Sequence, residues 1–287
     1  MEKACVPWRR AEEEGMMDSM IRCIVSDLDG TLLAPDHSLP TEVVRAIQAY
    51  KAKGGLFTIA TGRPLLTAQS IIEQIGIEIP VILCNGAVLA SFGKVIERKS
   101  LKAALLADML IDAHARGLMV LLFREEGIEV FARNEEVEAF EHKEQVQCKL
   151  VSVASSSWRS GELEKVILLG NIEAVEVLWH SWSPKLKYIA EKFQSEPNYV
   201  ELISAETSKG KALERLSDML GISKESIMAI GNQMNDLPML QAAGVGVAVA
   251  NSPAELKAAS NYVCSASYGE GVIEAINHFV YGRSNVV

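Results

Sequence analysis

Two aspartates separated by a single residue, Asp27 and Asp29, follow the apolar run Ile21 to Val25 and precede Gly30. Such a short and nearly continuous apolar run predicts a strand that is buried on both faces of a parallel sheet. Alternate residues share one face only while the chain stays extended, and a glycine frees the backbone to turn. We therefore expect both carboxylates to converge at the carboxyl end of this strand, where open α/β sheets bind ligands.

Three further polar clusters lie where a predicted strand ends or a predicted helix begins. They are Thr61-Gly62, Lys209, and the group Asn232/Asn235/Asp236. Taken alone, each cluster has an ordinary structural explanation, namely a strand-to-helix turn, a solvated lysine and helix N-caps. Their shared position at strand ends and helix starts instead favours one site along the carboxyl edge of a sheet.

Phosphoryl transfer is the chemistry that these residue types predict. It needs a nucleophile, an acid/base, donors for the phosphoryl oxygens and a counter-charge. Asp27 would attack phosphorus and form an aspartyl-phosphate, while Asp29 would protonate the leaving oxygen and later activate water. The Thr61 hydroxyl and nearby backbone N–H groups would bind phosphoryl oxygens, and Lys209 would balance charge. Asp236 would help to hold a divalent cation, together with Asn232.

The elements that must position these clusters alternate between strand and helix at both ends of the chain. Hydrophobic spacing predicts strands over residues 21–25, 56–60, 81–84, 226–230 and 245–249, and helices over 41–53, from Pro64, from Ser208 and up to Ala243. The first and last thirds therefore resemble one parallel sheet that an insertion divides.

The middle of the chain changes character from about Ser91. We expect a helix over 101–116, a hairpin of strands 118–123 and 128–132, a helix near Asn134, a Ser-rich loop over 151–161, strands over 165–169 and 199–203, and a helix that carries Trp179 and Trp182. Residues 187–194 fit either a strand or a helix. The tryptophans favour core packing over ligand stacking. This middle part is a second α/β module.

Composition excludes several classes of protein. The chain of 287 residues has a net charge of -9 and no Lys/Arg block, so we expect no nucleic-acid partner. The five cysteines are scattered without metal-type spacing, which is typical of reduced thiols in a cytoplasmic protein. Residues 1–20 lack an apolar stretch suited to a signal peptide or a membrane span, so we expect a mobile N-terminal extension and no membrane association.

The motifs DLDGTLL, TIATGRP, NGA, SKG and GNQMNDLPML, with the later AGVGVAVANSPAELKAAS and GEGV, resemble those of the haloacid dehalogenase superfamily, in particular its Cof-type phosphatases. This resemblance implies an α/β fold with a Rossmann-like parallel-sheet core, formed by residues 21–86 and 207–287, and an inserted α/β cap domain over residues 87–206. It also implies Mg²⁺ dependence and hydrolysis of small phosphorylated metabolites, such as sugar phosphates.

The resemblance also implies roles for individual residues. Asp27 would be the nucleophile and a metal ligand, and Asp29 would be the acid/base whose backbone carbonyl also reaches the metal. Thr61 and Lys209 would serve phosphate binding and charge balance. Asn235 would contact the substrate phosphate. The pair Asn85-Gly86 would lie at the entrance of the site, beside the hinge into the cap.

One residue departs from the family pattern G-D-x-x-N-D, because Asn232 stands where a third metal-binding carboxylate is expected. An amide oxygen still suits a hard cation, but it lacks the full negative charge of a carboxylate. We therefore expect weaker metal binding, with Asp236 compensating directly or through water. The substitution Asn232→Asp is expected to tighten Mg²⁺ activation.

Two other functions fit the same residues. A catalytically weak phospho-ligand binding or regulatory protein would explain Asn232, and a phosphomutase would use the same nucleophile. The sequence does not predict the substrate or the oligomeric state.

Overall fold

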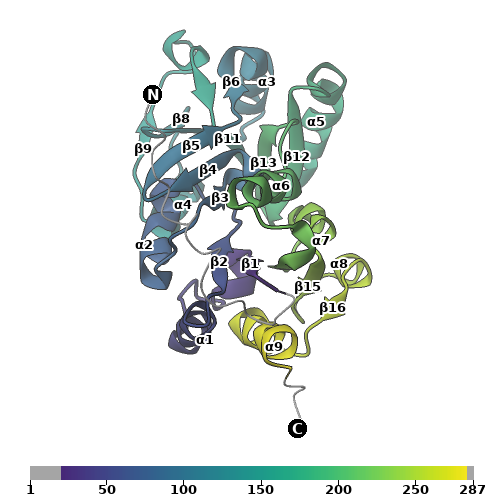
Figure 1. Cartoon of the computed structure of the whole chain (residues 1–287). Helices are drawn as coiled ribbons and strands as arrows, with labels where there is room; N and C mark the ends of the chain where they lie inside the picture. The colour runs from purple at the N-terminus through teal and green to yellow at the C-terminus, as the bar shows by residue number, and fades with distance from the viewer. Residues whose placement is uncertain (1–20, 283–287) are drawn as a thin grey trace. The chain divides into compact units, whose positions relative to one another are not determined.

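The computed structural model describes residues 21–282, which form two compact units (Figure 1). Within these residues, the first unit comprises 21–61, 69–96 and 208–282, and the second comprises 62–68 and 97–207. The first unit therefore joins the two ends of the chain, and the second is built mainly from its middle. The predicted extension over residues 1–20, with Cys5, lies outside the described residues.

A five-stranded sheet forms the centre of the first unit. Its strands, in spatial order, are β16 (Tyr262–Val263), β15 (Val245–Ala248), β14 (Ile227–Gly231), β1 (Cys23–Ser26) and β2 (Leu56–Ile59). All neighbouring strands pair in parallel. All four residues of β1 are buried, as expected of a strand covered on both faces. The predicted parallel sheet from both ends of the chain is confirmed.

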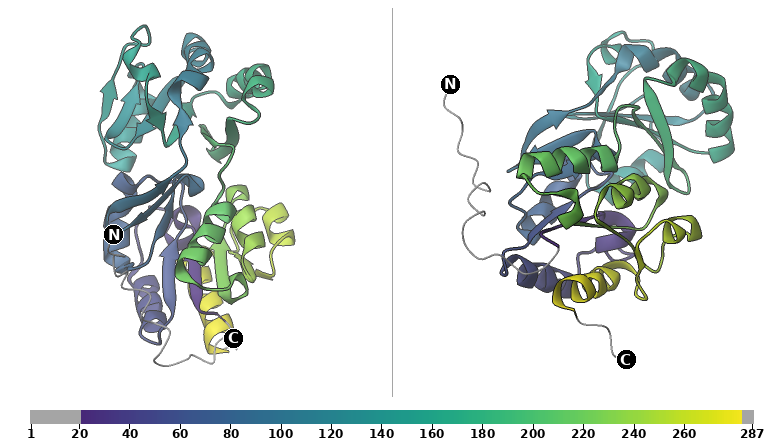
Figure 2. Two further views of the ribbon diagram at one scale, coloured as in Figure 1. Left: turned by 45° about the horizontal axis from the view of Figure 1, so that its top comes forward. Right: turned by 45° about the vertical axis from the view of Figure 1, so that its right-hand side comes forward.

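Helices cover this sheet on both faces (Figures 1 and 2). They are α1 (Thr41–Lys51), α2 (Leu65–Ile75), α6 (Lys209–Leu220), α7 (Leu237–Ala242), α8 (Ala254–Ala258) and α9 (Tyr268–Tyr281). Leu213 and Leu216 of α6 pack with Leu240 of α7 and with Val25 of β1 in one buried cluster. Helices α1 and α9 lie side by side away from that cluster (Figure 1). This arrangement is the three-layered α/β form that the alternating pattern predicts.

The strand expected over 81–84 differs from the prediction. Strand β3 (Val81–Leu83) joins the first sheet only through an isolated parallel bridge between Ala60 and Ile82. It instead pairs antiparallel with β4 (Val88–Ser91) in a sheet that continues to β5 (Lys94–Arg98). The reason is the tight turn η3 (Cys84–Gly86), where Asn85 has a φ of 54° and the chain reverses. Because β4 pairs with β3, the first unit extends to residue 96, beyond the predicted core segment 21–86.

The second unit contains a six-stranded, mostly antiparallel sheet. Its strands, in spatial order, are β12 (Ala190–Glu196), β13 (Tyr199–Ser204), β11 (Lys165–Leu169), β7 (Met119–Arg124), β8 (Gly127–Val130) and β9 (Cys148–Leu150). Val120 and Leu122 face a cluster with α3 (Ala103–Ala115) and α5 (Ile172–Leu186), which neighbour each other in Figure 2. Leu121 and Phe123 pack with α4 (Glu135–Glu144). This alternation is the period-2 pattern of a sheet that is covered on both faces.

Most predicted elements of the second unit are present, with local differences. The helix expected from Leu101 begins at Ala103, because β6 (Leu101–Lys102) pairs with β10 (Glu162–Leu163). The undecided segment 187–194 mostly belongs to strand β12, since α5 ends at Leu186. The Ser-rich segment 151–161 is a loop that includes the short 3₁₀ helix η4 (Ser157–Arg159). Among residues 21–282, no helix is long and apolar enough to cross a membrane.

Candidate active site

The first unit places Asp27 directly after β1, at the carboxyl edge of the parallel sheet. Its backbone N–H donates to the Ile230 carbonyl of β14 at 2.9 Å, so the pairing of β1 with β14 fixes the backbone position of Asp27. The chain then turns through η2 (Leu28–Leu32), in which Gly30 has a φ of 81° that favours glycine. The Asp27 side chain is buried, with 6% of the residue exposed. The end of β1 and the turn that follows therefore place a buried carboxylate at the carboxyl edge of the sheet.

Lys209 is the first residue of α6, and its ammonium group lies between two carboxylates. Lys209 Nζ donates to Asp27 Oδ1 and to Asp236 Oδ1, both at 2.6 Å. The Ser208 hydroxyl caps the helix by accepting from the Lys211 N–H at 3.1 Å. Lys209 is 0% exposed, so the alternative of a solvated lysine is wrong. Residues 182 positions apart in the sequence thus form one ionic cluster.

Burial and charge shift the pKa values of this cluster. Burial raises the pKa of Asp27 to about 7, the neighbouring Asp236 carboxylate adds to the rise, and Lys209 opposes it. Burial alone would lower the pKa of Lys209, but Asp236 and Asp27 outweigh burial and hold the pKa above its ordinary value. Lys209 therefore stays protonated, and its charge favours the ionised form of Asp27.

Asp236 is held on both of its oxygens by protein donors. Oδ1 accepts from Lys209, and Oδ2 accepts from the backbone N–H groups of Asn232 at 2.8 Å and Gln233 at 2.9 Å. A side chain at Gly231 would come within 2.5 Å of Asp236 Cβ, so this close approach requires glycine. Asp236 is 0% exposed. Its geometry favours a role in positioning Lys209 and the Asn232 backbone, and its role as a metal ligand stays a prediction.

The amide group of Asn232 faces Asp27 and the backbone of Asp29. Its inward atom lies 3.2 Å from Asp27 Oδ2, 3.1 Å from the Asp29 carbonyl oxygen and 3.0 Å from Thr31 Oγ1. An octahedral Mg²⁺ with bonds of about 2.1 Å holds neighbouring oxygens about 3.0 Å apart. With the amide oxygen inward, its distances to the Asp27 carboxylate and to the Asp29 carbonyl match this spacing, so these oxygen types suit a hard divalent cation. Residues 21–282 contain no cluster of three or more His, Cys, Asp or Glu side chains suited to a metal, so a cation here would use mixed oxygen donors.

The structure adds residues that the sequence motifs did not assign. His37 Nδ1 lies 3.1 Å from Asp29 Oδ1 and so contacts the predicted acid/base. Asn251 Nδ2 donates to the Gly30 carbonyl at 2.8 Å and ties down the turn after Asp27. Thr31 belongs to the D-x-D-G-T pattern, which could have drawn attention to its hydroxyl. Nothing in the sequence points to His37, because its contact depends on the path of the loop.

The predicted substrate-binding residues of the first unit lie on neighbouring loops. Thr61 is buried, its N–H donates to the Ile82 carbonyl, and its carbonyl accepts from the Asn85 N–H, both at 2.9 Å. Asn235 Nδ2 donates to Asn85 Oδ1 at 3.0 Å. The Gly86 carbonyl accepts from Arg215 at 2.8 Å. The backbone after β2 and the motif after β14 thus both contact Asn85, while the phosphate-binding roles stay predictions.

Gly62 belongs to the short segment 62–68 that groups with the second unit. Its carbonyl accepts a hydrogen bond from Lys165 Nζ at 2.8 Å. The structure therefore assigns Gly62 a structural contact within that unit, and its role in binding substrate stays a prediction.

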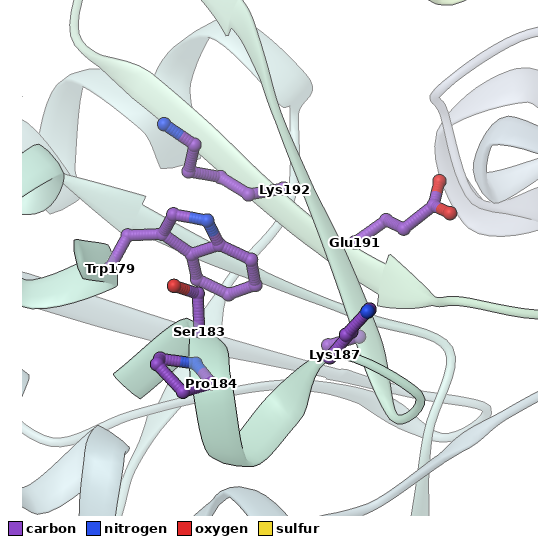
Figure 3. Close-up of a pocket in the computed structure, with 7 residues that line it drawn as sticks. Trp179, Ser183, Pro184, Lys187, Glu191 and Lys192 are labelled. Atoms are coloured by element: carbon purple, nitrogen blue, oxygen red, sulfur yellow. The ribbon is translucent and has the colours of Figure 1, made fainter. Parts of the chain in front are cut away.

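A pocket of about 430 Å³ lies in the second unit, between α5 and the start of β12 (Figure 3). It is lined by Trp179, Ser183, Pro184, Lys187, Ala190, Glu191 and Lys192. Trp179 also packs against the buried cluster under α3 and α5, as does Trp182, which confirms the predicted core packing. None of the predicted catalytic residues lines this pocket.

Comparison with known proteins adds a family to this geometry. A sequence model described as haloacid dehalogenase-like hydrolase matches residues 24–276. Pyridoxal phosphate phosphatase YbhA of Escherichia coli is 27% identical over 284 residues, which cover 91% of this chain and 98% of that protein. The 5-amino-6-(5-phospho-D-ribitylamino)uracil phosphatase YwtE of Bacillus subtilis is 27% identical over 296 residues, which cover 92% and 99%.

Solved structures of the same superfamily share this fold. A sugar phosphatase of subclass IIB of the same superfamily superposes with a TM-score of 0.79 at 25% sequence identity. The match covers 90% of this chain and 98% of that structure. Both units of the chain therefore have counterparts in a known phosphatase.

Proposed function

Because the chain belongs to the haloacid dehalogenase-like hydrolases, we propose that it is a Mg²⁺-dependent phosphatase that acts on small phosphorylated metabolites through an aspartyl-phosphate on Asp27. The observation that carries the proposal is the buried ammonium of Lys209, which contacts Asp27 Oδ1 at 2.6 Å. A buried carboxylate without a countercharge would be driven toward its protonated form, which is a poor nucleophile. Lys209 favours the form that attacks phosphorus.

The reaction consists of two displacements at phosphorus. In the first, the Asp27 carboxylate forms a bond to phosphorus, the ester P–O bond breaks, and Asp29 donates a proton to the leaving alcohol oxygen. In the second, Asp29 takes a proton from water, the water oxygen attacks the phosphorus of the aspartyl-phosphate, and inorganic phosphate leaves with Asp27 restored. His37 contacts Asp29 Oδ1 and so helps to orient the acid/base.

A divalent cation fits the oxygens of Asp27, the Asp29 backbone and Asn232. Such a cation would offset the negative charge of the phosphoryl group as the nucleophile approaches. The residues of this chain meet the remaining needs. Lys209 supplies a fixed positive charge beside Asp27, and Asp236 fixes the position of that charge through its own hydrogen bond.

The substrate class follows from the relatives. These relatives include a pyridoxal phosphate phosphatase, a 5-amino-6-(5-phospho-D-ribitylamino)uracil phosphatase and a sugar phosphatase. These compounds share a phosphate monoester on a small polar molecule. We therefore expect the substrate of this chain to be a soluble phosphate monoester, with sugar phosphates as the first group to test.

The test is phosphate release from a panel of sugar phosphates, nucleotides and cofactor phosphates in the presence of Mg²⁺. The wild type is expected to release phosphate, and Asp27→Asn is expected to abolish the release. Asp108→Asn is the matched control, because Asp108 is an exposed aspartate on α3 of the second unit and is not among the predicted site residues. Wild-type turnover by Asp27→Asn would contradict the proposal. Ligand-induced stabilisation without phosphate release would indicate a binding protein, and transfer of phosphate to a sugar would indicate a mutase.

A further inference from the structure

The amide of Asn232 occupies nearly the same space in two orientations, because its oxygen and nitrogen are similar in size. With the nitrogen inward, it donates toward the Asp29 carbonyl at 3.1 Å and Asp27 Oδ2 at 3.2 Å. With the oxygen inward, it accepts from the Thr31 hydroxyl at 3.0 Å and faces the same two oxygens. The two orientations therefore offer opposite partners to Asp27 and Asp29.

Protein groups alone favour the inward nitrogen. In that orientation the nitrogen faces acceptors and the outward oxygen faces donors, so both ends of the amide are satisfied. With the oxygen inward, the oxygens of Asn232, Asp27 and Asp29 face one another, and their mutual repulsion is costly in a buried site. Asn232 is 5% exposed, which leaves little room for solvent to relieve that cost.

Two neighbours allow the amide to turn. The Thr31 hydroxyl accepts from the nitrogen in one orientation and donates to the oxygen in the other, so it stabilises both. Gly30 leaves space beside the amide, since a Cβ at that position would come within 2.3 Å of the Asn232 side-chain nitrogen. The protein therefore surrounds Asn232 with groups that tolerate both orientations.

We propose that the Asn232 amide is a built-in substitute for the divalent cation: its nitrogen links Asp27 to the Asp29 carbonyl when no cation is bound, and the amide turns by half a rotation to present its oxygen when Mg²⁺ binds. The proposal rests on the proposed function, because it assumes that the cation uses these oxygens. In this proposal Asn232 is more than a weak metal ligand, because its amide nitrogen competes with the cation for the oxygens of Asp27 and Asp29. Binding of Mg²⁺ must then also supply the cost of turning the amide.

The substitution Asn232→Asp removes this competition and changes little in size. A carboxylate at position 232 has no hydrogen to donate, and it adds negative charge beside the two buried carboxylates Asp27 and Asp236. The variant is therefore expected to be less stable than the wild type without a cation. The variant is expected to gain more stability from Mg²⁺ than the wild type does. In the variant the cation relieves repulsion between carboxylates, whereas in the wild type it must displace the hydrogen bonds of the Asn232 amide.

The experiment measures the melting temperature of the full chain in EDTA and across a Mg²⁺ titration. We expect Asn232→Asp to melt several degrees below the wild type in EDTA, and to show the larger rise and the lower half-saturating Mg²⁺ concentration. Asn261→Asp is the matched control, because the Asn261 side-chain oxygen only accepts from the Gly246 N–H, which a carboxylate also does. Its Mg²⁺ response should equal that of the wild type. Equal Mg²⁺ responses of Asn232→Asp and the wild type would overturn the proposal.

A measurement on the wild type keeps the proposal testable if the variant does not fold. In a chain labelled with ¹⁵N asparagine, the side-chain NH₂ signals of Asn232 can be identified by their absence from an Asn232→Ser variant. We expect these signals to be protected from hydrogen exchange in EDTA and to shift and lose protection with Mg²⁺. If Mg²⁺ raises the melting temperature but leaves these signals unmoved, the inference fails. Phosphate release by the wild type and its loss in Asp27→Asn would still support the proposed function.

Discussion

Among residues 21–282, each of the two units contains one buried lysine that contacts a carboxylate, and the two settings differ greatly. Lys209 of the first unit is 0% exposed and lies between two aspartates at the ends of strands. Lys165 of the second unit is 4% exposed, and it donates to Glu201 Oε2 of the adjacent strand at 3.0 Å. The Lys165 ammonium also lies 4.7 Å from the centre of the Phe123 ring.

The difference between the two lysines shows that burial of a charge does not by itself mark a catalytic group. Lys209 carries one positive charge for two carboxylates, so the cluster retains negative charge that a cation can offset. Lys165 and Glu201 are a balanced pair inside a sheet, where their charges compensate each other. We therefore infer that the first lysine serves chemistry and the second serves the second unit's structure.

The largest expected effect comes from Lys209→Met. Removal of the ammonium leaves Asp27 and Asp236 buried without compensation, so phosphate release should fall by at least about 100-fold. The free energy of unfolding should fall by about 3–5 kcal/mol, the usual result of breaking a buried ion pair from one side. Steady-state phosphate release and urea unfolding measure the two effects.

The control for this change is Lys211→Met, which alters an exposed lysine on the same helix. It is expected to leave phosphate release and stability close to those of the wild type. If Lys209→Met turns over substrate as fast as this control, Lys209 is not needed for the reaction. The inferred difference in function between Lys209 and Lys165 would then be wrong.

The second prediction concerns Lys165→Met. It should lower the free energy of unfolding by about 3–5 kcal/mol, because the buried Glu201 carboxylate then loses the positive charge that contacts it at 3.0 Å. The double variant Lys165→Met/Glu201→Leu should recover most of that loss, since well-packed apolar residues often replace a buried ion pair without cost. Urea unfolding of the two variants and of Glu201→Leu alone forms a double-mutant cycle.

Activity sharpens this second prediction. Phosphate release per folded molecule should be unchanged in the double variant, because the pair serves structure. A large loss of turnover in a stable double variant would instead connect Lys165 to the reaction through its contact with the Gly62 carbonyl.

The sequence predicted Lys209 as a site residue and missed the buried Lys165 for a physical reason. Lys209 stands at a helix start after a predicted strand, which is a local pattern. Lys165 opens the run KVILL, and its pairing with Glu201 depends on which strands become neighbours and in which register. Register is a tertiary property, so no spacing within one segment could indicate the pair.

The same distinction explains the other differences. Asp27, Asp236 and Asn232 follow apolar strands, so their place at the sheet edge could be predicted. His37 reaches Asp29 through a loop whose path has no sequence period. Strand β3 was expected in the parallel sheet because its three apolar residues suit either kind of pairing. The Asn85-Gly86 dipeptide after it is typical of a hairpin turn, and both residues have positive φ in the structure.

A third prediction concerns Glu274, a carboxylate of the first unit whose hydrogen-bond donors are uncharged N–H and O–H groups. Glu274 of α9 accepts from the backbone and hydroxyl of Ser265, from the Ala266 N–H and from the Tyr262 hydroxyl. Burial alone would raise the pKa of Glu274, but these donors outweigh burial and hold the pKa below its ordinary value of 4.5. The ionised form is therefore the one that stabilises the fold.

The sign of the pH dependence follows from that shift. The stabilisation by Glu274 is complete above pH 4.5 and is lost as the pH falls through the lowered pKa of the folded state. Glu274→Gln should cost about 1–3 kcal/mol at neutral pH, because one carboxylate oxygen is replaced by an NH₂ group that faces N–H and O–H donors. In urea unfolding at several pH values, the difference between wild type and variant should shrink under acidic conditions. A constant difference would show that the ionised form has no special role.

The smallest expected effects compare the N-caps of two helices, one in each unit. Asn134 Oδ1 caps α4 by accepting from the Val137 N–H at 3.1 Å, and Ser208 caps α6 at the same distance. Removal of either cap by substitution with alanine should cost about 1 kcal/mol of stability.

Only Ser208→Ala should also lower phosphate release. The next residue is Lys209, so loosening of the first turn of α6 moves the Lys209 ammonium relative to Asp27. Ser208→Thr keeps a capping hydroxyl and should restore both properties. Equal turnover in the two alanine variants would show that the position of Lys209 is fixed by its ion pairs alone, without help from the helix start.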